Sequence, residues 1–541
     1  MDCHCIPYTQ LPHIPRLFTD FLYHYPRVSE FFPLNPFEEE SFSQAARSLQ
    51  YSTVLRREMV AVLQEQNQRF SAGEQTFRNL ALLEKPDCFA VVTGQQAGLF
   101  TGSAFAIYKA LTAVKVARTL SQRGLPAVPV FWLATEDHDL AEVNHCYVQD
   151  RDGNPQQLAY SENPPVEDAP VGSIQFTEAI QTTLEALRGF LPESSDQAAL
   201  LESLSECYRP GESFGTAFGR FMARLFADYG IVLVDPLDVR LHSLSSHVFR
   251  TAVESATTLV GELIECNRRL QDGGYHPQVR VTENSSLLFY YADGQRVPLR
   301  LRDGQFVSSR GQTYSPQELL AQLQQRPGIL SPNVLLRPVM QDALLPTIAY
   351  VGGPSELAYL AQAAPVYQRV LGHMPVLLPR ASFTILEQPT NRLLAKFGLT
   401  LLDVCAGKQA LREKMAAHFL PPDLTEVFRK AAASLDENLE AIQKSLGKLD
   451  PTLVDAAANS ARKMHYQLST VERKAAAAAQ TRSEQVERDA LRLENSLYPH
   501  KALQERLYSG INYLARYGPQ FLTRIYEQID LNSRDHQLLV L

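Results

Sequence analysis

Residues 88–102 have the sequence Cys88-Phe-Ala-Val-Val-Thr-Gly94-Gln-Gln-Ala-Gly98-Leu-Phe-Thr-Gly102. A short apolar, β-branched run that ends at a glycine is typical of a buried strand in a parallel sheet. Residues 103–123 favour a helix, Gly124 can end it, and residues 128–134 form a second apolar run. Strand, glycine loop, helix and strand make a βαβ unit, so we expect an α/β fold with a parallel-sheet core.

The remaining chain up to residue 385 is expected to complete this core. Residues 1–85 mix aromatic-proline segments with a polar helical stretch, which indicates a helical N-terminal lead-in. We assign residues 86–385 to the core, with insertions at about residues 150–330. Within the insertions, Ser286–Tyr291 and Val297–Arg302 flank an Asp-Gly turn and resemble a β-hairpin. Further core strands are predicted at residues 231–234 and 375–380.

Residues 386–495 have the pattern of a helical coiled coil. Apolar residues recur at spacings of seven, four, three and four, which is heptad spacing. These residues are Phe428, Leu435, Leu439, Ile442 and Leu446. Gly447 can end this helix and Pro451 can begin a second one, so we predict an antiparallel hairpin. A hairpin of this length buries little apolar surface by itself, and we expect homodimerisation through it. Residues 496–541 are expected to pack back on the core.

The composition restricts the class of protein. Of 541 residues, 45% are apolar and 20% are charged, which indicates a folded globular chain. The net charge of −8 disfavours nucleic acid and membrane surfaces as partners. The chain has no apolar run of about 18 residues and no signal-peptide pattern, so we expect a cytoplasmic protein. Seven scattered cysteines indicate reduced thiols, and Cys3-His4-Cys5 has no second ligand pair, so no metal site is expected.

The glycine loop after the first predicted strand is one candidate binding site. Backbone N–H groups at the start of the following helix could meet a phosphate or carboxylate. The loop matches neither the dinucleotide-binding nor the Walker pattern, and a tight strand-to-helix connection without a ligand is the alternative. Neighbouring side-chain amides could hydrogen-bond a polar ligand. The candidate residues are Gly94, Gln95, Gln96, Gly98, Thr101 and Gly102.

A second cluster follows the second predicted strand. Glu136, Asp137 and Asp139 flank His138, and such carboxylates could supply a base, orient the imidazole, hold Mg²⁺ or bind a substrate amine. We therefore predict that these four residues are catalytic. His138 and His145 are seven residues apart and would share a helix face. A capped helix start with a satisfied histidine is the alternative, and the missing cysteine pair disfavours zinc. Asn144 and His145 are candidate binding residues.

The third candidate is residues 351–359, again a glycine loop after an apolar stretch. Its glycines permit a close approach of the backbone to a ligand, whereas a helix capped by Ser355 is the structural alternative. Arg337 and Arg380 adjoin apolar segments, where a guanidinium often meets a carboxylate or phosphate, although either could balance a core acid. The candidate binding residues are Gly352, Gly353, Ser355, Glu356 and Arg380.

Several of these motifs carry a family likeness. Residues 92–102, 129–139, 142–145, 352–356 and 503–506 resemble signatures of the cysteine-adding enzymes of bacillithiol biosynthesis. The likeness runs through most of the chain, and one departure is Ser103, where the family pattern has proline. The resemblance implies a Rossmann-like core related to nucleotidyl transferases and class I synthetases, an inserted connecting region, a coiled-coil hairpin and a homodimer.

The resemblance also implies a reaction, in which a ligase joins the carboxylate of cysteine to the amine of glucosaminyl malate, the last step to bacillithiol. Amide formation in water needs an activated carboxylate, so we expect ATP to supply an acyl adenylate or acyl phosphate, with Mg²⁺ as a further expected cofactor. His138 or a neighbouring acid would deprotonate the sugar amine. Gln95, Gln96 and Asn144 would position the substrates.

Two other classes of function stay open on the residues alone. A nucleotide-binding partner protein without its own chemistry would use the hairpin to recruit the true ligase. The dense clustering of acids around His138 argues against this class. A nucleotidyl transferase that acts on another small molecule would use the same core, because a fold does not settle a function.

Overall fold

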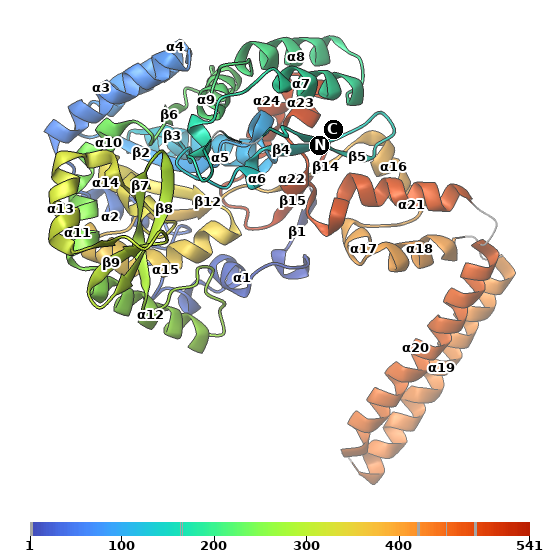
Figure 1. The fold of residues 1–541 in the computed structure, drawn as a ribbon. Helices are drawn as coiled ribbons and strands as arrows, with labels where there is room; N and C mark the ends of the chain where they lie inside the picture. Colours follow the sequence, from blue (N-terminus) through green and yellow to red (C-terminus); the bar gives the residue numbers. More distant parts are fainter. Residues whose placement is uncertain (1–3, 163, 165, 419–421, 451, 481–483) are drawn as a thin grey trace. The chain divides into compact units, whose positions relative to one another are not determined.

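The structure is a computed structural model that describes residues 4–162, 164, 166–418, 422–450, 452–480 and 484–541. The described chain forms two compact units, which are treated separately here (Figure 1). The core unit contains His4–Phe383 and Glu505–Gln537, and the hairpin unit contains Thr384–Gln504 and Leu538–Leu541. The chain passes from one unit to the other within strand β14 (Phe383–Leu386), between Gln504 and Glu505, and within strand β15 (His536–Val540).

A five-stranded sheet lies at the centre of the core unit. Its strand order is β13-β12-β2-β3-β6, and every neighbouring pair is parallel. The strands are β2 (Phe89–Gln95), β3 (Ala127–Leu133), β6 (Val232–Val234), β12 (Thr347–Gly352) and β13 (Val376–Pro379). Helix α5 (Phe105–Gln122) connects β2 to β3, so the predicted βαβ unit and parallel sheet are confirmed. All five strands point their carboxyl ends to the same edge of the sheet.

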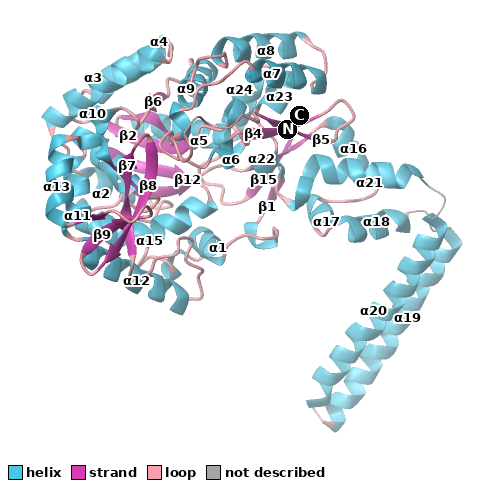
Figure 2. Cartoon of the chain, in the orientation of Figure 1, coloured by secondary structure: helices cyan, strands magenta, loops and turns pink. Residues whose placement is uncertain are grey.

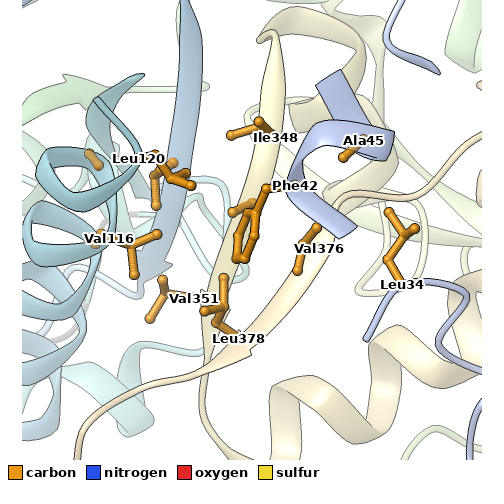
Figure 3. Close-up of a cluster of buried hydrophobic side chains, with 13 residues drawn as sticks. Leu34, Phe42, Ala45, Val116, Leu120, Ile348, Val351, Val376 and Leu378 are labelled. Carbon is orange, nitrogen blue, oxygen red and sulfur yellow. The ribbon is translucent and has the colours of Figure 1, made fainter. Parts of the chain in front are cut away.

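Apolar side chains from helices and strands form a core against this sheet (Figure 3). Phe42 and Ala45 come from α2 (Glu40–Ser48), and Val116 and Leu120 come from α5. They pack with Ile348, Val351, Val376 and Leu378 of β12 and β13. Each fully buried side chain of this size contributes about 1.5–3 kcal/mol, so the cluster fixes the strands whose ends carry the site.

An antiparallel sheet of five strands is inserted between β6 and β12. Its order is β10-β9-β8-β7-β11, with β7 (Ser285–Ala292), β8 (Gln295–Arg302), β9 (Gln305–Ser308), β10 (Thr313–Tyr314) and β11 (Leu330–Pro332). Strands β7 and β8 form the predicted hairpin, and both turn residues, Asp293 and Gly294, have positive φ. Asp-Gly is favoured at such a turn because both positions require this conformation.

The remaining elements of the core unit are helical apart from three short strands. The strands are β1 (His4–Ile6) and the antiparallel pair β4 (His145–Gln149) and β5 (Pro155–Ala159). The N-terminal helices are α1 (Arg16–Tyr23), α3 (Thr53–Arg69) and α4 (Glu74–Leu83). The later helices are α6 (Leu140–Val143), α7 (Ala179–Phe190), α8 (Ser195–Cys207), α9 (Phe214–Leu225), α10 (Val239–Leu244), α11 (Ser246–Glu254), α12 (Ala256–Asp272), α13 (Pro316–Gln325), α14 (Arg337–Leu344), α15 (Pro354–Val370), α22 (Gln504–Leu507), α23 (Ile511–Tyr517) and α24 (Gln520–Gln528).

The hairpin unit is mainly helical (Figure 2). Its helices are α16 (Gln388–Lys396), α17 (Leu401–Cys405), α18 (Lys408–Ala417), α19 (Pro422–Leu449), α20 (Thr452–Gln480) and α21 (Glu484–Leu497). Helices α19 and α20 lie side by side, and contacts of Asp436 with His465 and of Gly447 with Val454 show that they are antiparallel. The predicted helix end at Gly447 is wrong, because α19 continues to Leu449. Pro451 lies outside the described residues. In the described part of the chain, no helix combines the length and apolar character needed to cross a membrane.

Candidate functional site

A cavity of about 500 Å³ opens at the carboxyl ends of β2, β3 and β12. Ligands of open α/β sheets bind at this edge, and the volume is in the range of small-molecule sites. The cavity, called the main cavity below, brings together most of the predicted site residues. These are Gly94, Gln95, Gln96, Glu136, Asp137, His138, Gly353, Ser355, Glu356 and Arg380.

A smaller cavity of about 330 Å³, called the side cavity below, shares part of its wall with the main cavity. It is lined by predicted residues of the glycine loop and by His145. The predicted residues here are Gln95, Gln96, Gly98, Thr101, Gly102 and His145. Asp139, Asn144 and Gly352 line neither cavity, which corrects their expected place in the site. The Asn144 amide instead donates to the Tyr160 carbonyl at 3.3 Å.

The four residues predicted to be catalytic point in different directions. Asp137 faces the glycine loop, since its Oδ2 accepts a hydrogen bond from Gln96 Nε2 at 2.5 Å. Asp139 caps the short helix α6 by accepting from the Glu142 amide at 3.3 Å. Because the carboxylates diverge, they do not form the joint Mg²⁺ site that the sequence allowed. Among the described residues, no group of three His, Cys, Asp or Glu side chains is placed to hold a metal ion.

His138 is held by an arginine from the inserted sheet. Arg296 of β8 donates from Nη1 to His138 Nδ1 at 3.3 Å, and its guanidinium lies 3.9 Å from the centre of the Phe289 ring. Arg296 also donates to Ser331 Oγ at 2.8 Å and to the Pro332 carbonyl. A neutral imidazole whose Nδ1 accepts a hydrogen bond carries its proton on Nε2. His138 is thus set up to donate from Nε2 rather than to accept a proton there.

The shared helix face expected for His138 and His145 is wrong. Helix α6 has only four residues, because the Asn144 carbonyl accepts from the Tyr160 amide at 2.8 Å and His145 begins strand β4. The two histidines consequently line different cavities.

Glu136 is paired with a histidine that the sequence did not single out. Its Oε1 lies 3.1 Å from His242 Nε2, and the two side chains are 6% and 3% exposed. Each ring nitrogen of His242 also lies 3.1 Å from a backbone carbonyl, Nδ1 from that of Leu330 and Nε2 from that of Pro236. Burial alone would lower the pKa of His242, but the Glu136 carboxylate and these carbonyls raise it above its ordinary value.

A buried lysine joins the glycine loop to helix α15. Lys109 is 1% exposed, and its Nζ lies 2.5 Å from Glu356 Oε2 and 2.9 Å from both the Gly94 carbonyl and Gln95 Oε1. Burial would raise the pKa of Glu356, but the Lys109 ammonium outweighs it and lowers that pKa. Glu356 also accepts from the Gly353 amide at 2.8 Å and caps the helix, so the expected cap by Ser355 is wrong. Ser355 instead lines the main cavity.

Arg380 forms an ion pair with a core acid, which was one of the two kinds of partner expected for it. Its Nη2 donates to Glu505 Oε1 at 2.6 Å, and Glu505 also accepts from Ser382 Oγ at 2.8 Å and from the Phe383 amide at 3.0 Å. Burial would raise the pKa of Glu505, but the Arg380 guanidinium lowers it. Arg380 still lines the main cavity, where Glu505 fixes its orientation.

Three other arginines of the main cavity have no ion-pair partner among the described residues. They are Arg296, Arg337 and Arg506. Arg337 donates to Tyr359 Oη at 2.9 Å and to Gln341 Oε1 at 3.2 Å, both of which are neutral. Guanidinium groups bind carboxylates and phosphates well, so the cavity is prepared for a ligand with more than one negative charge.

The glycine loop differs from the expected phosphate cradle. The amides of Gly98, Gly102 and Ala104 donate to the carbonyls of Gln96, Leu99 and Tyr508 at 2.8, 2.9 and 2.8 Å. The loop amides at the start of α5 are therefore engaged within the protein. Gly94 has a packing role, because a Cβ there would lie 2.7 Å from the Trp132 carbonyl. The arginines of the main cavity are the alternative groups that could bind an anion there.

Two family models cover almost the whole chain. Residues 1–381 match the N-terminal Rossmann-like domain of bacillithiol biosynthesis BshC, and residues 383–541 match its C-terminal coiled-coil domain. The first match agrees with the parallel sheet and the second with the α19–α20 hairpin, so the expected fold class is confirmed.

Full-length relatives give the same result. A protein of Solibacter usitatus is 39% identical over 540 residues, which cover 100% of both chains. A Koribacter versatilis protein is 40% identical over 514 residues, 95% of each chain, and one from Salinibacter ruber is 33% identical over 99% of this chain and 98% of its own. All three bear the name "Putative cysteine ligase BshC".

Proposed function

The chain belongs to the BshC family of bacillithiol biosynthesis, and from this membership we propose that it is a cysteine ligase. It joins the carboxylate of L-cysteine to the amine of glucosaminyl malate and forms the amide bond of bacillithiol. The observation that carries the proposal is the main cavity, whose lining includes both the Asp137 carboxylate and guanidinium groups that form no ion pair among the described residues. Both substrates are small and carry carboxylates, which suits such a cavity.

The arginines are assigned to the negative charges of the substrates. Glucosaminyl malate has two malate carboxylates, and ATP has a polyphosphate chain. Arg296 is 8% exposed and fixed by Ser331 and Pro332, so it loses little conformational freedom when an anion binds. Arg337 is held by Tyr359 in a similar way. A preorganised guanidinium of this kind can bind a carboxylate through two parallel hydrogen bonds.

We propose ATP as the activating substrate. A cysteine carboxylate oxygen attacks phosphorus, and an acyl adenylate forms with release of pyrophosphate, or an acyl phosphate with release of ADP. The sugar amine then attacks the carbonyl carbon, the C–N bond forms, and the C–O bond to phosphate breaks. Mg²⁺ enters with the ATP as its counter-ion. We assign the phosphates to the arginines rather than to the glycine loop, because the amides of Gly98 and Gly102 donate within the protein.

We assign Asp137 as the base that accepts the proton of the attacking amine. Its Oδ2 accepts from Gln96 and its Oδ1 from the His138 amide at 2.8 Å, so the carboxylate is oriented and keeps acceptor capacity. His138, whose Nδ1 accepts from Arg296, is assigned to donate a hydrogen bond from Nε2 to the developing oxyanion. This division replaces the joint catalytic role expected for the four residues 136–139 and gives Glu136 a positioning role.

The hairpin supports the proposal of a homodimer. Ile442 of α19 and Met464 of α20 are apolar, but their side chains are 50% and 48% exposed. A second copy could cover them, which would complete the coiled coil.

Light scattering of the Ile442→Glu variant should give half the mass of the wild type. The control variant, Lys444→Glu, should keep the mass of the wild type. An unchanged mass of Ile442→Glu contradicts the dimer. A cytoplasmic location completes the proposal, since free thiols persist there.

The proposed reaction is tested by incubating the purified chain with L-cysteine, glucosaminyl malate and Mg-ATP, each omitted in turn. Mass spectrometry should detect bacillithiol only in the complete mixture, together with AMP for an adenylate or ADP for an acyl phosphate. Product without ATP would contradict the activation step. No product under any condition would contradict the ligase proposal and favour a missing partner or another substrate.

A further inference from the structure

The site has two compartments that meet at a shared wall. The wall consists of Gln95, Gln96, Phe105 and Arg506, which line both the main cavity and the side cavity. Gln96 Nε2 donates to Asp137 Oδ2 at 2.5 Å and to Glu142 Oε2 at 2.7 Å. One of these carboxylates lines the main cavity and the other lines the side cavity. A single amide therefore holds one acid in each compartment.

A buried hydroxyl without a hydrogen-bond partner belongs to a residue in the wall of the side cavity. Thr101 lines this cavity, is 0% exposed, and its Oγ1 has no hydrogen-bond partner in the described chain. A buried polar atom left unpaired is costly, and native proteins seldom leave one unless something else binds it. Thr101 and its neighbour Phe100 also have positive φ values of 76° and 49°. Strained non-glycine residues of this kind are concentrated at functional sites.

The charges of the side cavity suit a zwitterion. Glu142 supplies a carboxylate, and Arg506 in the shared wall supplies a guanidinium. Val143, Cys146 and Leu507 add apolar or weakly polar atoms to the lining, and Ser103, His145 and Tyr147 add polar ones. Burial raises the pKa of the Cys146 thiol to about 12, so it stays protonated and does not exchange with a bound thiol. An α-amino acid with a short uncharged side chain matches this combination.

Resting on the proposed ligase function, we propose that the side cavity is the amino-acid compartment. Glu142 binds the α-ammonium group, and Arg506 binds the α-carboxylate at the shared wall. The main cavity then holds the amine substrate on the other side of the wall. This arrangement delivers the cysteine carboxylate to the junction, where activation and attack by the amine can take place, and keeps the thiol away from it.

The test compares L-cysteine with 3-mercaptopropionate, which lacks the ammonium group, and cysteamine, which lacks the carboxylate. Binding to the full-length protein is measured by calorimetry under reducing conditions. In the wild type, L-cysteine should bind about 10- to 100-fold more tightly than either analogue. Glu142→Gln should remove most of the preference over 3-mercaptopropionate, and Arg506→Gln should remove most of that over cysteamine.

Steady-state kinetics supply the matched control. Glu142→Gln should raise the KM for L-cysteine and change the KM for glucosaminyl malate less than about twofold, whereas Arg296→Lys should do the reverse. An unchanged analogue preference in Glu142→Gln, or a KM effect confined to glucosaminyl malate, would overturn the compartment assignment while the ligase function stands. If the wild type neither binds L-cysteine nor forms product, the ligase function itself fails. Because Glu142 is exposed, its substitution should leave the unfolding temperature unchanged.

Discussion

His242 Nε2 lies 3.1 Å from Glu136 Oε1, and both side chains are buried, with Glu136 in the wall of the main cavity. Both nitrogens of the imidazole also face carbonyl oxygens, so the charged form of His242 has an acceptor for each N–H. The pair joins β3, which ends just before Glu136, to helix α10, which carries His242. It thereby fixes the segment that contains Asp137 and His138.

The first prediction concerns His242→Gln, which keeps a donor but removes the charge. Breaking a buried pair leaves Glu136 without its counter-charge and should lower the free energy of unfolding by about 3 kcal/mol. Because the pKa of His242 is raised in the folded state, the stabilisation is present below its unfolded value of about 6.5 and is lost as pH rises through the folded value. Urea unfolding at about pH 6 and about pH 9 should therefore show that the variant's free energy of unfolding falls further below that of the wild type at the lower pH. An equal deficit at both would contradict a charged pair.

The second prediction separates the two residues assigned to proton transfer. Asp137→Asn should reduce kcat about 10²- to 10⁴-fold, because the acceptor for the amine proton is lost. His138→Gln should cost about tenfold, since a glutamine amide can still donate a hydrogen bond. Both variants should form the homodimer and bind L-cysteine as the wild type does. The reverse order of the two kcat losses would return the role of base to His138.

Local pattern was sufficient to predict the sheet. The apolar runs at β2 and β3 are each ended by turn-forming or polar residues, and the helix between them stops at Gly124, whose φ of 84° favours glycine. These signals lie within a few residues of the elements that they define. The carboxyl ends of parallel strands meet at one edge, and at this edge Gln96 Nε2 lies 2.5 Å from Asp137 Oδ2.

The partners of those residues could not be predicted in the same way. Arg296 lies more than about 100 residues after His138, which it contacts, and His242 lies as far after its partner Glu136. Both are on elements with no chemical signature of their own. The β7–β8 hairpin was predicted only as a connection, and its strand pattern does not show that Arg296 and Phe289 face the site. The helix expected after Asp139 does form but ends at Val143, because pairing with β5 draws His145 into a strand.

The third prediction uses two arginines of the same strand. Arg296→Lys loses the planar group that spans Ser331, Pro332 and His138, and should raise the KM for glucosaminyl malate about 10- to 100-fold. Arg300→Lys on the exposed face of β8 is the matched control and should stay within about twofold of the wild type. Initial rates at varied substrate concentration measure both. Equal KM values for the two variants would show that Arg296 does not bind this substrate.

The fourth prediction concerns acid stability and depends on His536. This residue is fully buried, its Nδ1 lies 2.7 Å from Ser382 Oγ, and Ser382 donates to the same Glu505 that holds Arg380. Burial lowers the pKa of His536 to about 4, although the nearby Glu505 opposes the change. Between about pH 6.5 and pH 4 the unfolded chain therefore binds a proton that the folded chain does not, and the folded state loses stability as pH falls.

Across that interval the protonation of His536 should lower the free energy of unfolding by up to about 3 kcal/mol, which corresponds to a pKa difference of about 2.5. His536→Asn, which keeps a polar group next to Ser382, should be less stable at neutral pH but lose less stability on acidification. Urea unfolding of both proteins at several pH values between about 4 and 7 measures the two slopes. The slope of the variant should be the smaller one, because its residue 536 does not titrate. Parallel slopes would show that His536 is already protonated in the folded state, and the Ser382–Glu505 network that orients Arg380 would then contain a second positive charge.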